Sequence, residues 1–336
     1  MDKKILITGA SGFIGSFMVE EGLRLGMQVW AGVRRSSSRK YLQDARIRFA
    51  ELDFTDSDTL EKQLSAHKRE HGGWDYIIHC AGATKCLHRD EFEIANHWGT
   101  RHFVETLRRL SMTPRRFVCL SSLSVFGPVH EKDYADICND DTPRPDTAYG
   151  ISKLHAEEFL RSLPDFPYVI LRPTGVYGPR EHDYFLMMKS VSRHFDIVAG
   201  FRRQDLTFVY VTDLVQAAYA ALDRPIVRKS FFISDGNVYG SRTFSDLIRK
   251  ELGNPWTIRF VCPLFLLRFI SFIAGNAARL SRKPGTLNSD KYRIMRQRNW
   301  RCDITPAVKE LGYKPRVTLE EGVRKTIAWY KKEGWL

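Results

Sequence analysis

Paired cysteines are absent from this sequence, which limits the chemistry it can support. None of its six cysteines forms a C-x-x-C pair, and none has a histidine at zinc-finger spacing. Structural metal sites and disulfide frameworks depend on such spacings. We therefore expect no metal site and interpret the cysteines as reduced thiols.

A secretory signal is also missing. Residues Met1–Lys4 run directly into an apolar, strand-like segment, with no apolar stretch that ends in a small-residue cleavage site. Together with the unpaired cysteines, this pattern leads us to expect a cytoplasmic protein.

No long apolar run is free of interruptions. The most apolar stretch, residues 260–280, contains Pro263, Arg268 and Asn276, whereas a membrane-spanning helix needs about 20 mainly apolar residues. Two interpretations stay open for this stretch. It packs as a helix within a substrate-binding domain, or it forms an apolar lid or a helix that contacts a membrane surface.

Acidic residues are outnumbered, with 39 against 52 basic residues and a net charge of +13. The basic residues are scattered and no basic patch is interleaved with aromatics, so we do not expect nucleic acid as a partner. An anionic cofactor and substrate account for the charge more simply. The length of 336 residues suits one large domain, or a large one with a small one.

A glycine-rich turn stands near the N-terminus. Lys4–Ile7 is typical of a buried strand, and Thr8–Gly15 (TGASGFIG) leads into a helical pattern that runs through Leu25. Glycines at this spacing let the backbone approach a pyrophosphate, which then lies on the N-terminus of the helix. The predicted dinucleotide contacts in this turn are Gly9, Ser11, Gly12, Phe13, Ile14 and Gly15.

The second strand, residues 28–33, ends in Arg34 and Arg35 where an acid is common. An acid would accept hydrogen bonds from the adenosine ribose, whereas arginine favours a 2′-phosphate. The sequence therefore favours NADP as the cofactor, with NAD as the alternative. Both arginines could equally be solvated surface charges.

Alternating strands and helices continue to about residue 124. Strands are expected at 47–52, 74–80 and 116–120, and a helix at 92–110. This alternation predicts a doubly wound parallel α/β sheet with ligands at the carboxyl edge of its strands. The further cofactor contacts predicted at this edge are Leu52, Asp53, Ala81, Gly82, Ala83 and Asn96.

Tyr149 and Lys153 lie four residues apart in the segment Tyr-Gly-Ile-Ser-Lys. If the segment opens a helix, both side chains project from the same face. A phenol has a reference pKa of about 10, and a neighbouring positive charge favours its ionised form. Such a pair suits the interconversion of an alcohol and a ketone, although tyrosine and lysine also meet at this spacing by chance.

The ordered combination of these motifs resembles the extended short-chain dehydrogenases/reductases. This family includes NAD(P)-dependent nucleotide-sugar epimerases and dehydratases, and enzymes like 3β-hydroxysteroid dehydrogenase. The resemblance spans nearly the whole chain and is strongest in the segments Thr8–Gly15 (TGxxGxxG), 121–127 (SSLSVFG), 149–153 (YxxxK), 171–179, 208–215 and 310–315.

The resemblance implies roles for individual residues. Ser122 would hold the substrate oxygen, Tyr149 would act as acid and base, and Lys153 would lower the pKa of the tyrosine and bind the nicotinamide ribose. Further cofactor contacts would come from Pro173, Gly175 and Val176, and further substrate contacts from Ser124, Thr174 and Arg180.

Two departures from the family pattern reduce the number of candidate reactions and substrates. Family dehydratases carry Asp-Glu after the catalytic hydroxyl residue, where this chain has Leu123-Ser124, so dehydration is disfavoured. Many nucleotide-sugar epimerases carry Arg-Asp before the strand that matches 208–211, where this chain has Leu206-Thr207. Either the substrate lacks a diphosphate, or another arginine replaces the missing one; the candidates are Arg180, Arg202, Arg203 and Arg301.

The same resemblance predicts two domains. A Rossmann domain that binds NAD(P) would comprise residues 1–175 and 205–235, and a smaller, C-terminal substrate-binding domain would comprise 176–204 and 236–318. A C-terminal helix over 319–336 would follow, with Val323, Ile327 and Tyr330 on one stripe. We also expect a homodimer that pairs the helices at 92–110 and 149–163.

The function expected from the sequence is hydride transfer at a secondary alcohol or ketone by an NAD(P)-dependent oxidoreductase. One alternative is a nucleotide-sugar epimerase with a tightly held cofactor. Another is a cofactor-sensing binding protein that has kept the fold without the chemistry. The substrate would be a nucleotide sugar, a ketone or a sterol-like molecule.

Overall fold

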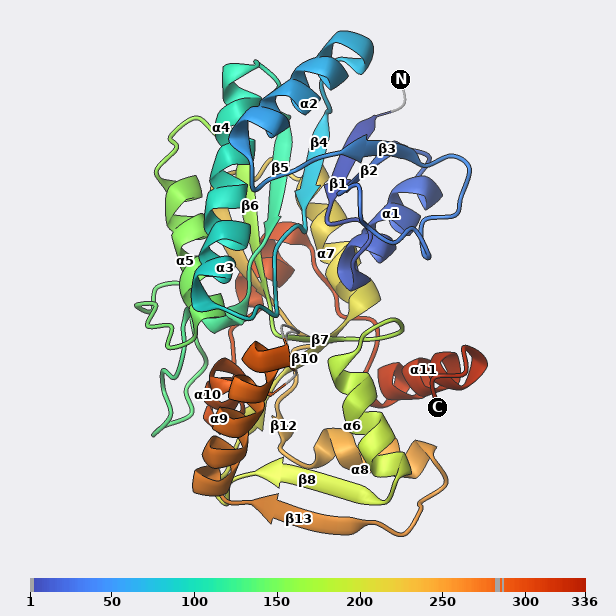
Figure 1. Ribbon diagram of the computed structural model, residues 1–336, viewed down its shortest axis with the longest axis vertical. Coiled ribbons are helices and arrows are strands. Elements are labelled where there is room, and N and C mark those ends of the chain that lie inside the picture. The colour runs from blue at the N-terminus through green and yellow to red at the C-terminus, as the bar shows by residue number, and fades with distance from the viewer. Residues whose placement is uncertain (1–2, 282–284, 286) are drawn as a thin grey trace.

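A seven-stranded parallel sheet forms the larger part of the molecule (Figure 1). The computed structural model describes residues 3–281, 285 and 287–336, so residues 282–284 and 286 of the predicted 236–318 segment lie outside the described residues. The strand order is β11-β6-β5-β4-β1-β2-β3. The bounds are β1 Lys4–Thr8, β2 Gln28–Val33, β3 Arg48–Glu51, β4 Tyr76–His79, β5 Arg116–Leu120, β6 Tyr168–Pro173 and β11 Lys229–Ile233.

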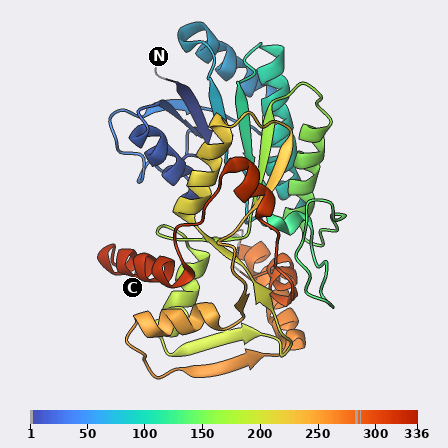
Figure 2. The ribbon, with the colours of Figure 1, turned by 180° about the vertical axis from the view of Figure 1, so that it is seen from behind.

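Helices cover both faces of this sheet, as the two opposite views show (Figures 1 and 2). Along β1, Ile5 and Ile7 enter one buried cluster with α1 and α7, whereas Leu6 enters the other with α2, α4 and α5. Alternate residues of a strand point to opposite faces, so a sheet covered on both sides needs continuous apolar runs. The predicted doubly wound fold is confirmed. The helices are α1 Phe13–Arg24, α2 Ser57–His71, α4 Gly99–Arg109, α5 Ala148–Arg161 and α7 Val211–Asp223.

The predicted helix over 92–110 has three parts. A short helix, α3 (Arg89–Phe92), continues into the π-helical turn η1 (Glu93–Trp98) and then into α4. π-helical turns inside α-helices are rare and are frequent at functional sites. This one carries Asn96 and turns its side chain toward the end of β4.

A buried ion pair ties α5 to the sheet. The Arg172 guanidinium on β6 donates to both carboxylate oxygens of Glu157 on α5, at 3.0 and 2.6 Å. Both side chains are only 1% exposed. Separating the two side chains would leave buried, unpaired charges. This contact therefore strongly favours one packing position of α5 on the sheet.

The smaller domain lies beyond the carboxyl edge of the sheet (Figure 1). Its core includes Tyr177, Met188, Phe208 and Phe244, and the helix α11 (Leu319–Lys332) adds the predicted stripe of Val323, Ile327 and Tyr330. Its other elements are β7 Gly175–Tyr177, α6 Asp183–Ser192, β8 Phe195–Ala199, β9 Asp205–Leu206, β10 Phe208–Tyr210, β12 Tyr239–Gly240, α8 Thr243–Glu251, β13 Ile258–Cys262, α9 Leu264–Ser281 and α10 Ser289–Arg296. Residues 205–210 of the predicted Rossmann segment 205–235 therefore pack in the smaller domain.

Part of the predicted substrate-binding segment 236–318 returns to the Rossmann domain. Ala307 and Leu311 of the turn η3 (Ala307–Leu311), with Tyr313, are buried in the core cluster of α1 and α7. The Tyr313 hydroxyl donates to the Ser234 carbonyl oxygen, just beyond β11, at 2.9 Å. The structure therefore places these residues with the sheet, and the return was not visible in the sequence because the segment is short and irregular.

The stretch 260–280 is partly strand and partly helix. Residues up to Cys262 belong to β13, and α9 starts at Leu264, after Pro263. Among the residues that the structure describes, no helix combines the length and the apolar character that crossing a bilayer requires.

Candidate active site

The glycine-rich turn packs directly against the end of β4. Gly9 has φ +63°, and a Cβ on this residue would lie 2.8 Å from the backbone of Cys80 and Ala81. A side chain on Gly15 would collide with the backbone of Gly9 and Ala10. Both glycines are therefore required by close backbone packing, which holds the turn beside the Ala81–Ala83 loop.

The N-terminus of α1 has the features of an anion-binding site. Gly12 is its N-cap residue and offers no side-chain cap, and the first turn contains no acid. The first amide groups of a helix have no partner within the helix. Those of Phe13, Ile14 and Gly15 thus point to the turn, and with the dipole of α1 they form a site that fits a pyrophosphate.

His79 bonds the first residue of the glycine-rich turn, Thr8. One ring nitrogen bonds the Thr8 hydroxyl at 2.9 Å, and the other bonds the Thr100 hydroxyl at 3.1 Å. Burial, and to a lesser extent the nearby Lys153 ammonium, lower the pKa of His79 to about 3. The imidazole is therefore neutral at physiological pH, and its bonded nitrogens give it a structural role.

Asn96 connects two parts of the site that are distant in sequence. Its side-chain oxygen accepts from the Ala83 amide at 2.8 Å, and its nitrogen donates to the Ala83 carbonyl and the Ser152 hydroxyl, at 3.1 and 2.9 Å. Ser152 in turn donates to the Tyr149 carbonyl at 2.9 Å. Asn96 was predicted to contact the cofactor. In the structure, both hydrogens of its side-chain amide are used in bonds that position α5 against the loop after β4.

The first turn of α5 is held from three directions. The Thr147 hydroxyl accepts from the Gly150 amide at 3.0 Å, and the Asp290 carboxylate of α10 accepts from the Ala148 amide at 2.7 Å. A Cβ on Gly150 would collide with the Ser124 carbonyl oxygen. This turn carries half-buried Tyr149, and it lies against the serine segment that follows β5.

Lys153 completes this arrangement. Its ammonium donates to the Leu120 carbonyl, the last of β5, at 2.9 Å. A Cβ on Gly82 would lie 3.2 Å from the same nitrogen. Two residues beyond Leu120, the Ser122 hydroxyl bonds the Ser124 hydroxyl and accepts from the Ser124 amide, both at 3.1 Å. Lys153 and Ser122 thus lie at the carboxyl end of β5, and Tyr149 stands four residues before Lys153 on α5.

Two hydroxyls at this edge lack partners. The oxygens of Ser121, after β5, and Thr174, after β6, are buried and make no hydrogen bond with described residues. Buried polar groups are nearly always satisfied. An unsatisfied pair at the edge where ligands bind fits a site that is completed by a bound molecule.

The residues expected near the adenosine differ in their exposure to solvent. Arg34 and Arg35 are exposed, and neither side chain makes an ion pair within the described part of the chain. Asp53 is half-buried and accepts from the Thr55 amide and hydroxyl, at 3.0 and 2.6 Å. The side chain of Leu52 is buried in the core, so only its backbone faces the edge.

The candidate arginines for a diphosphate are mostly occupied. Arg180 donates to Ser16 and Glu20 of α1, at 2.9 and 2.6 Å. Arg203 is bonded to Asp205, and Arg301 to Asp136 at 2.7 Å. The structure therefore does not bring Arg180 to Ser122 and Tyr149; it uses that guanidinium to join the start of the smaller domain to α1.

A model of the NAD-dependent epimerase/dehydratase family matches residues 5–231. The chain belongs to this family. The match runs from β1 into β11 and includes the glycine-rich turn, η1, the serine segment after β5 and α5.

Relatives similar over their whole length include epimerases and a dehydrogenase. The chain is 28% identical over 349 residues to the protein YbjS of Escherichia coli, covering 99% of each. It is 26% identical to a UDP-glucose 4-epimerase of Vibrio cholerae, covering 97% of this chain and 95% of the relative. It is 25% identical to sterol-4-alpha-carboxylate 3-dehydrogenase of Saccharomyces cerevisiae, covering 97% of each.

Among solved structures, the Bordetella bronchiseptica enzyme WbmG, determined with NAD and UDP, is similar with a TM-score of 0.77. The identity is 22%, and the match covers 100% of this chain and 97% of that one. The likeness supports the fold. Family membership identifies the chain as an enzyme of the NAD-dependent epimerase/dehydratase type, and the glycine turn, the uncapped helix and the unsatisfied hydroxyls fit such a dinucleotide.

Two glycines offer a matched test of the turn. In Gly9→Ala, the new Cβ meets the backbone of Cys80 and Ala81 at a positive φ. We expect dinucleotide affinity to fall by about 10-fold or more, since contacts to a charged ligand contribute roughly 1.5–3 kcal/mol each. Isothermal titration calorimetry with each cofactor measures this change.

Gly26→Ala is the control, because Gly26 also has a positive φ but open space around it. It should lose about 1–2 kcal/mol of stability from backbone strain alone and keep its affinity. Equal affinity losses in both variants would show that the close packing at Gly9 does not shape the cofactor site.

Proposed function

We propose that this protein catalyses hydride transfer at a secondary alcohol or ketone, with Tyr149 as the acid and base. The observation that carries the proposal is the Lys153 ammonium on the Leu120 carbonyl, 2.9 Å away. It anchors the second turn of α5 to the end of β5, two residues before Ser122. This anchor supports a site in which the Tyr149 phenol, the Lys153 ammonium and the Ser122 hydroxyl act together. This is the constellation that proton transfer to a carbonyl oxygen requires.

Each side chain has a distinct task. Ser122 donates a hydrogen bond that orients the substrate oxygen, and Tyr149 delivers or accepts the proton on that oxygen. Lys153 stabilises the negative charge that Tyr149 carries after giving up its proton. The bound dinucleotide supplies or takes up the hydride.

We further propose NADP as the preferred cofactor. Arg34 and Arg35 follow β2 as exposed cations, and no acid stands at the end of that strand to bind a ribose diol. The Ser37 hydroxyl accepts from the Arg34 amide at 3.1 Å, which orders the loop between them. Arginine is the residue that binds phosphate with paired, charge-assisted hydrogen bonds.

The arrangement of arginines favours a substrate without a diphosphate. Of the four candidate arginines, Arg180, Arg203 and Arg301 are bonded to acids of this chain, which leaves only exposed Arg202 without an ion pair among the described residues. Leu206 and Thr207 replace the Arg-Asp pair that many epimerases carry. We therefore favour a dehydrogenase or reductase. A nucleotide-sugar epimerase is the second candidate, since a relative of that activity matches over 97% of this chain.

Tyr149→Phe tests the mechanism. Losing a general acid and base should reduce turnover roughly 10²–10⁴-fold while cofactor affinity is unchanged. Tyr134→Phe is the control, since this tyrosine donates to the Arg203 carbonyl and accepts from the Arg298 guanidinium, and it should retain activity. A fully active Tyr149→Phe enzyme would contradict the mechanism.

Absorbance at the reduced nicotinamide band during turnover separates the two candidate reactions. A dehydrogenase or reductase changes it in proportion to product, whereas an epimerase converts substrate with no net change. A panel of ketones, sterols and nucleotide sugars should be screened with either cofactor.

Arg34→Ala combined with Arg35→Ala tests the cofactor choice. Removing contacts worth roughly 1.5–3 kcal/mol each should weaken NADP binding by at least about 10-fold and leave NAD binding unchanged. Titration calorimetry with both cofactors measures the ratio. An unchanged ratio would show that both arginines are solvated surface charges.

A further inference from the structure

The two-stranded sheet of β8 and β13 buries an acid and exposes apolar side chains. Asp196 is buried and pairs with Arg242 at 2.7 Å and with Arg259 at 3.2 Å. On the other side, Phe195 lies beside Ile258 and Ile197 beside Phe260, in parallel register. All four of these apolar side chains are exposed. A sheet on a water-facing surface normally has the opposite arrangement.

Helix α9 follows β13 and likewise buries a polar residue while it exposes apolar ones. Ser271 is buried, and its hydroxyl has no partner among the described residues. Phe265, Phe269 and Phe272 form a stripe at helical spacing and are 77%, 61% and 65% exposed. Ile273 and Leu280 are exposed as well. Figure 1 shows β8, β13 and α9 together at the end of the molecule away from the seven-stranded sheet.

The charge pattern of this region selects one kind of partner. No acid occurs between Glu251 and Asp290. Exposed Arg193, Arg202 and Arg268 make no ion pair within the described residues.

We propose that this apolar end face, comprising β8, β13 and α9, binds the surface of an anionic lipid bilayer. Large apolar side chains gathered on exposed elements are typical of an interaction site. Phenylalanine and isoleucine enter the boundary between headgroups and acyl chains, while arginine meets the negative headgroups. A protein partner would need acids, whereas a bilayer offers both an apolar layer and negative charge over the whole face. The proposal does not depend on the reaction catalysed.

Flotation of the tag-free protein with lipid vesicles tests the proposal. It should float with vesicles of phosphatidylcholine and phosphatidylglycerol, less with phosphatidylcholine alone, and less again at high salt. Phe269→Ser with Phe272→Ser should reduce the bound fraction by roughly 10- to 100-fold, since each removes a buried aromatic contact with lipid.

Leu25→Ser with Val227→Ser is the matched control, because both residues are exposed and apolar but belong to the Rossmann domain. It should float like the unaltered protein. Absence from the lipid fraction in both compositions, or equal flotation of the α9 variant, would overturn the proposal. So would a dimer that the α9 variant dissociates without any binding to vesicles.

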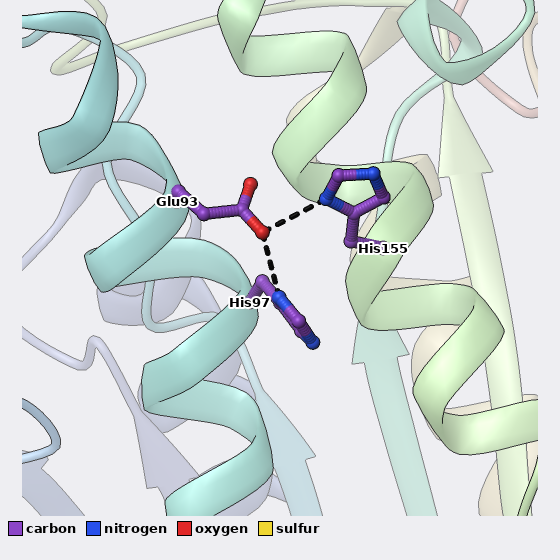
Figure 3. A group of neighbouring side chains, drawn as sticks. All are labelled: Glu93, His97 and His155. Atoms are coloured by element: carbon purple, nitrogen blue, oxygen red, sulfur yellow. Dashed lines mark hydrogen bonds and ion pairs between the residues drawn. The ribbon is translucent and has the colours of Figure 1, made fainter.

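A second cluster points to a metal ion. Glu93 and His97 lie one turn apart on η1, and His155 projects toward them from α5 (Figure 3). Their ligand atoms lie within 4.8 Å of one another. A single Glu93 oxygen meets the Nδ1 of His97 at 2.7 Å and of His155 at 2.8 Å. All three residues are half-buried.

We infer that Glu93, His97 and His155 bind a zinc ion between η1 and α5. Two imidazoles and one carboxylate are common ligands of zinc, and water completes the coordination. Each ring would carry its proton on Nε2, which leaves the Nδ1 lone pair for the metal. The ion would join the two elements that also carry Asn96 and Tyr149.

Zinc titration of tag-free protein against a chromogenic chelator tests this site. One zinc should bind per chain, and His97→Gln or His155→Gln should weaken it by at least about 10-fold. His182→Gln is the control, because this histidine stacks on Trp335 outside the cluster. No binding, or equal affinity in all variants, would mean that the cluster is only a hydrogen-bonded contact.

Discussion

The contact between the Lys153 ammonium and the Leu120 carbonyl is the constraint on which the site depends. It joins the second turn of α5 to the last residue of β5. Tyr149 stands four residues before Lys153 and Ser122 two residues after Leu120, so the contact sets the spacing between their two segments. The Arg172–Glu157 ion pair holds the far part of the same helix to β6. Asp290 of α10 holds its first amide from the other domain. These contacts fix the helix backbone that carries Tyr149 at three levels, as the proposed mechanism requires.

Close backbone packing extends this constraint to the cofactor side. Gly9 lies against the end of β4, and Gly82 lies against Asn96 and Lys153. A side chain at either position would separate the glycine turn from α5. Because the Asn96 amide also connects the Ala83 backbone with Ser152, displacement of the loop after β4 would reach Tyr149 directly.

The sequence predicted the parts of this arrangement that depend on local pattern. The strand and helix around Thr8–Gly15, the serine segment after β5 and the Tyr149–Lys153 spacing lie where expected, because each is read over a few residues. Contacts between distant segments were not predictable. The Asn96–Ser152 bond, the Arg180 link to α1 and the outward-facing phenylalanines of α9 depend on packing that periodicity does not record. The apolar pattern of α9 indicated a helix but not which side faces water.

Hydride transfer at the end of β5 is the central claim, and isotope transfer tests it most directly. The protein would be incubated with reduced cofactor deuterated at the transferring carbon and with the ketone that the screen identifies. Mass spectrometry would then locate the label. The account predicts deuterium on the carbinol carbon of the product, which Tyr149→Phe should form roughly 10²–10⁴-fold more slowly. Product formed with solvent hydrogen on that carbon, while the cofactor keeps its label, would contradict it.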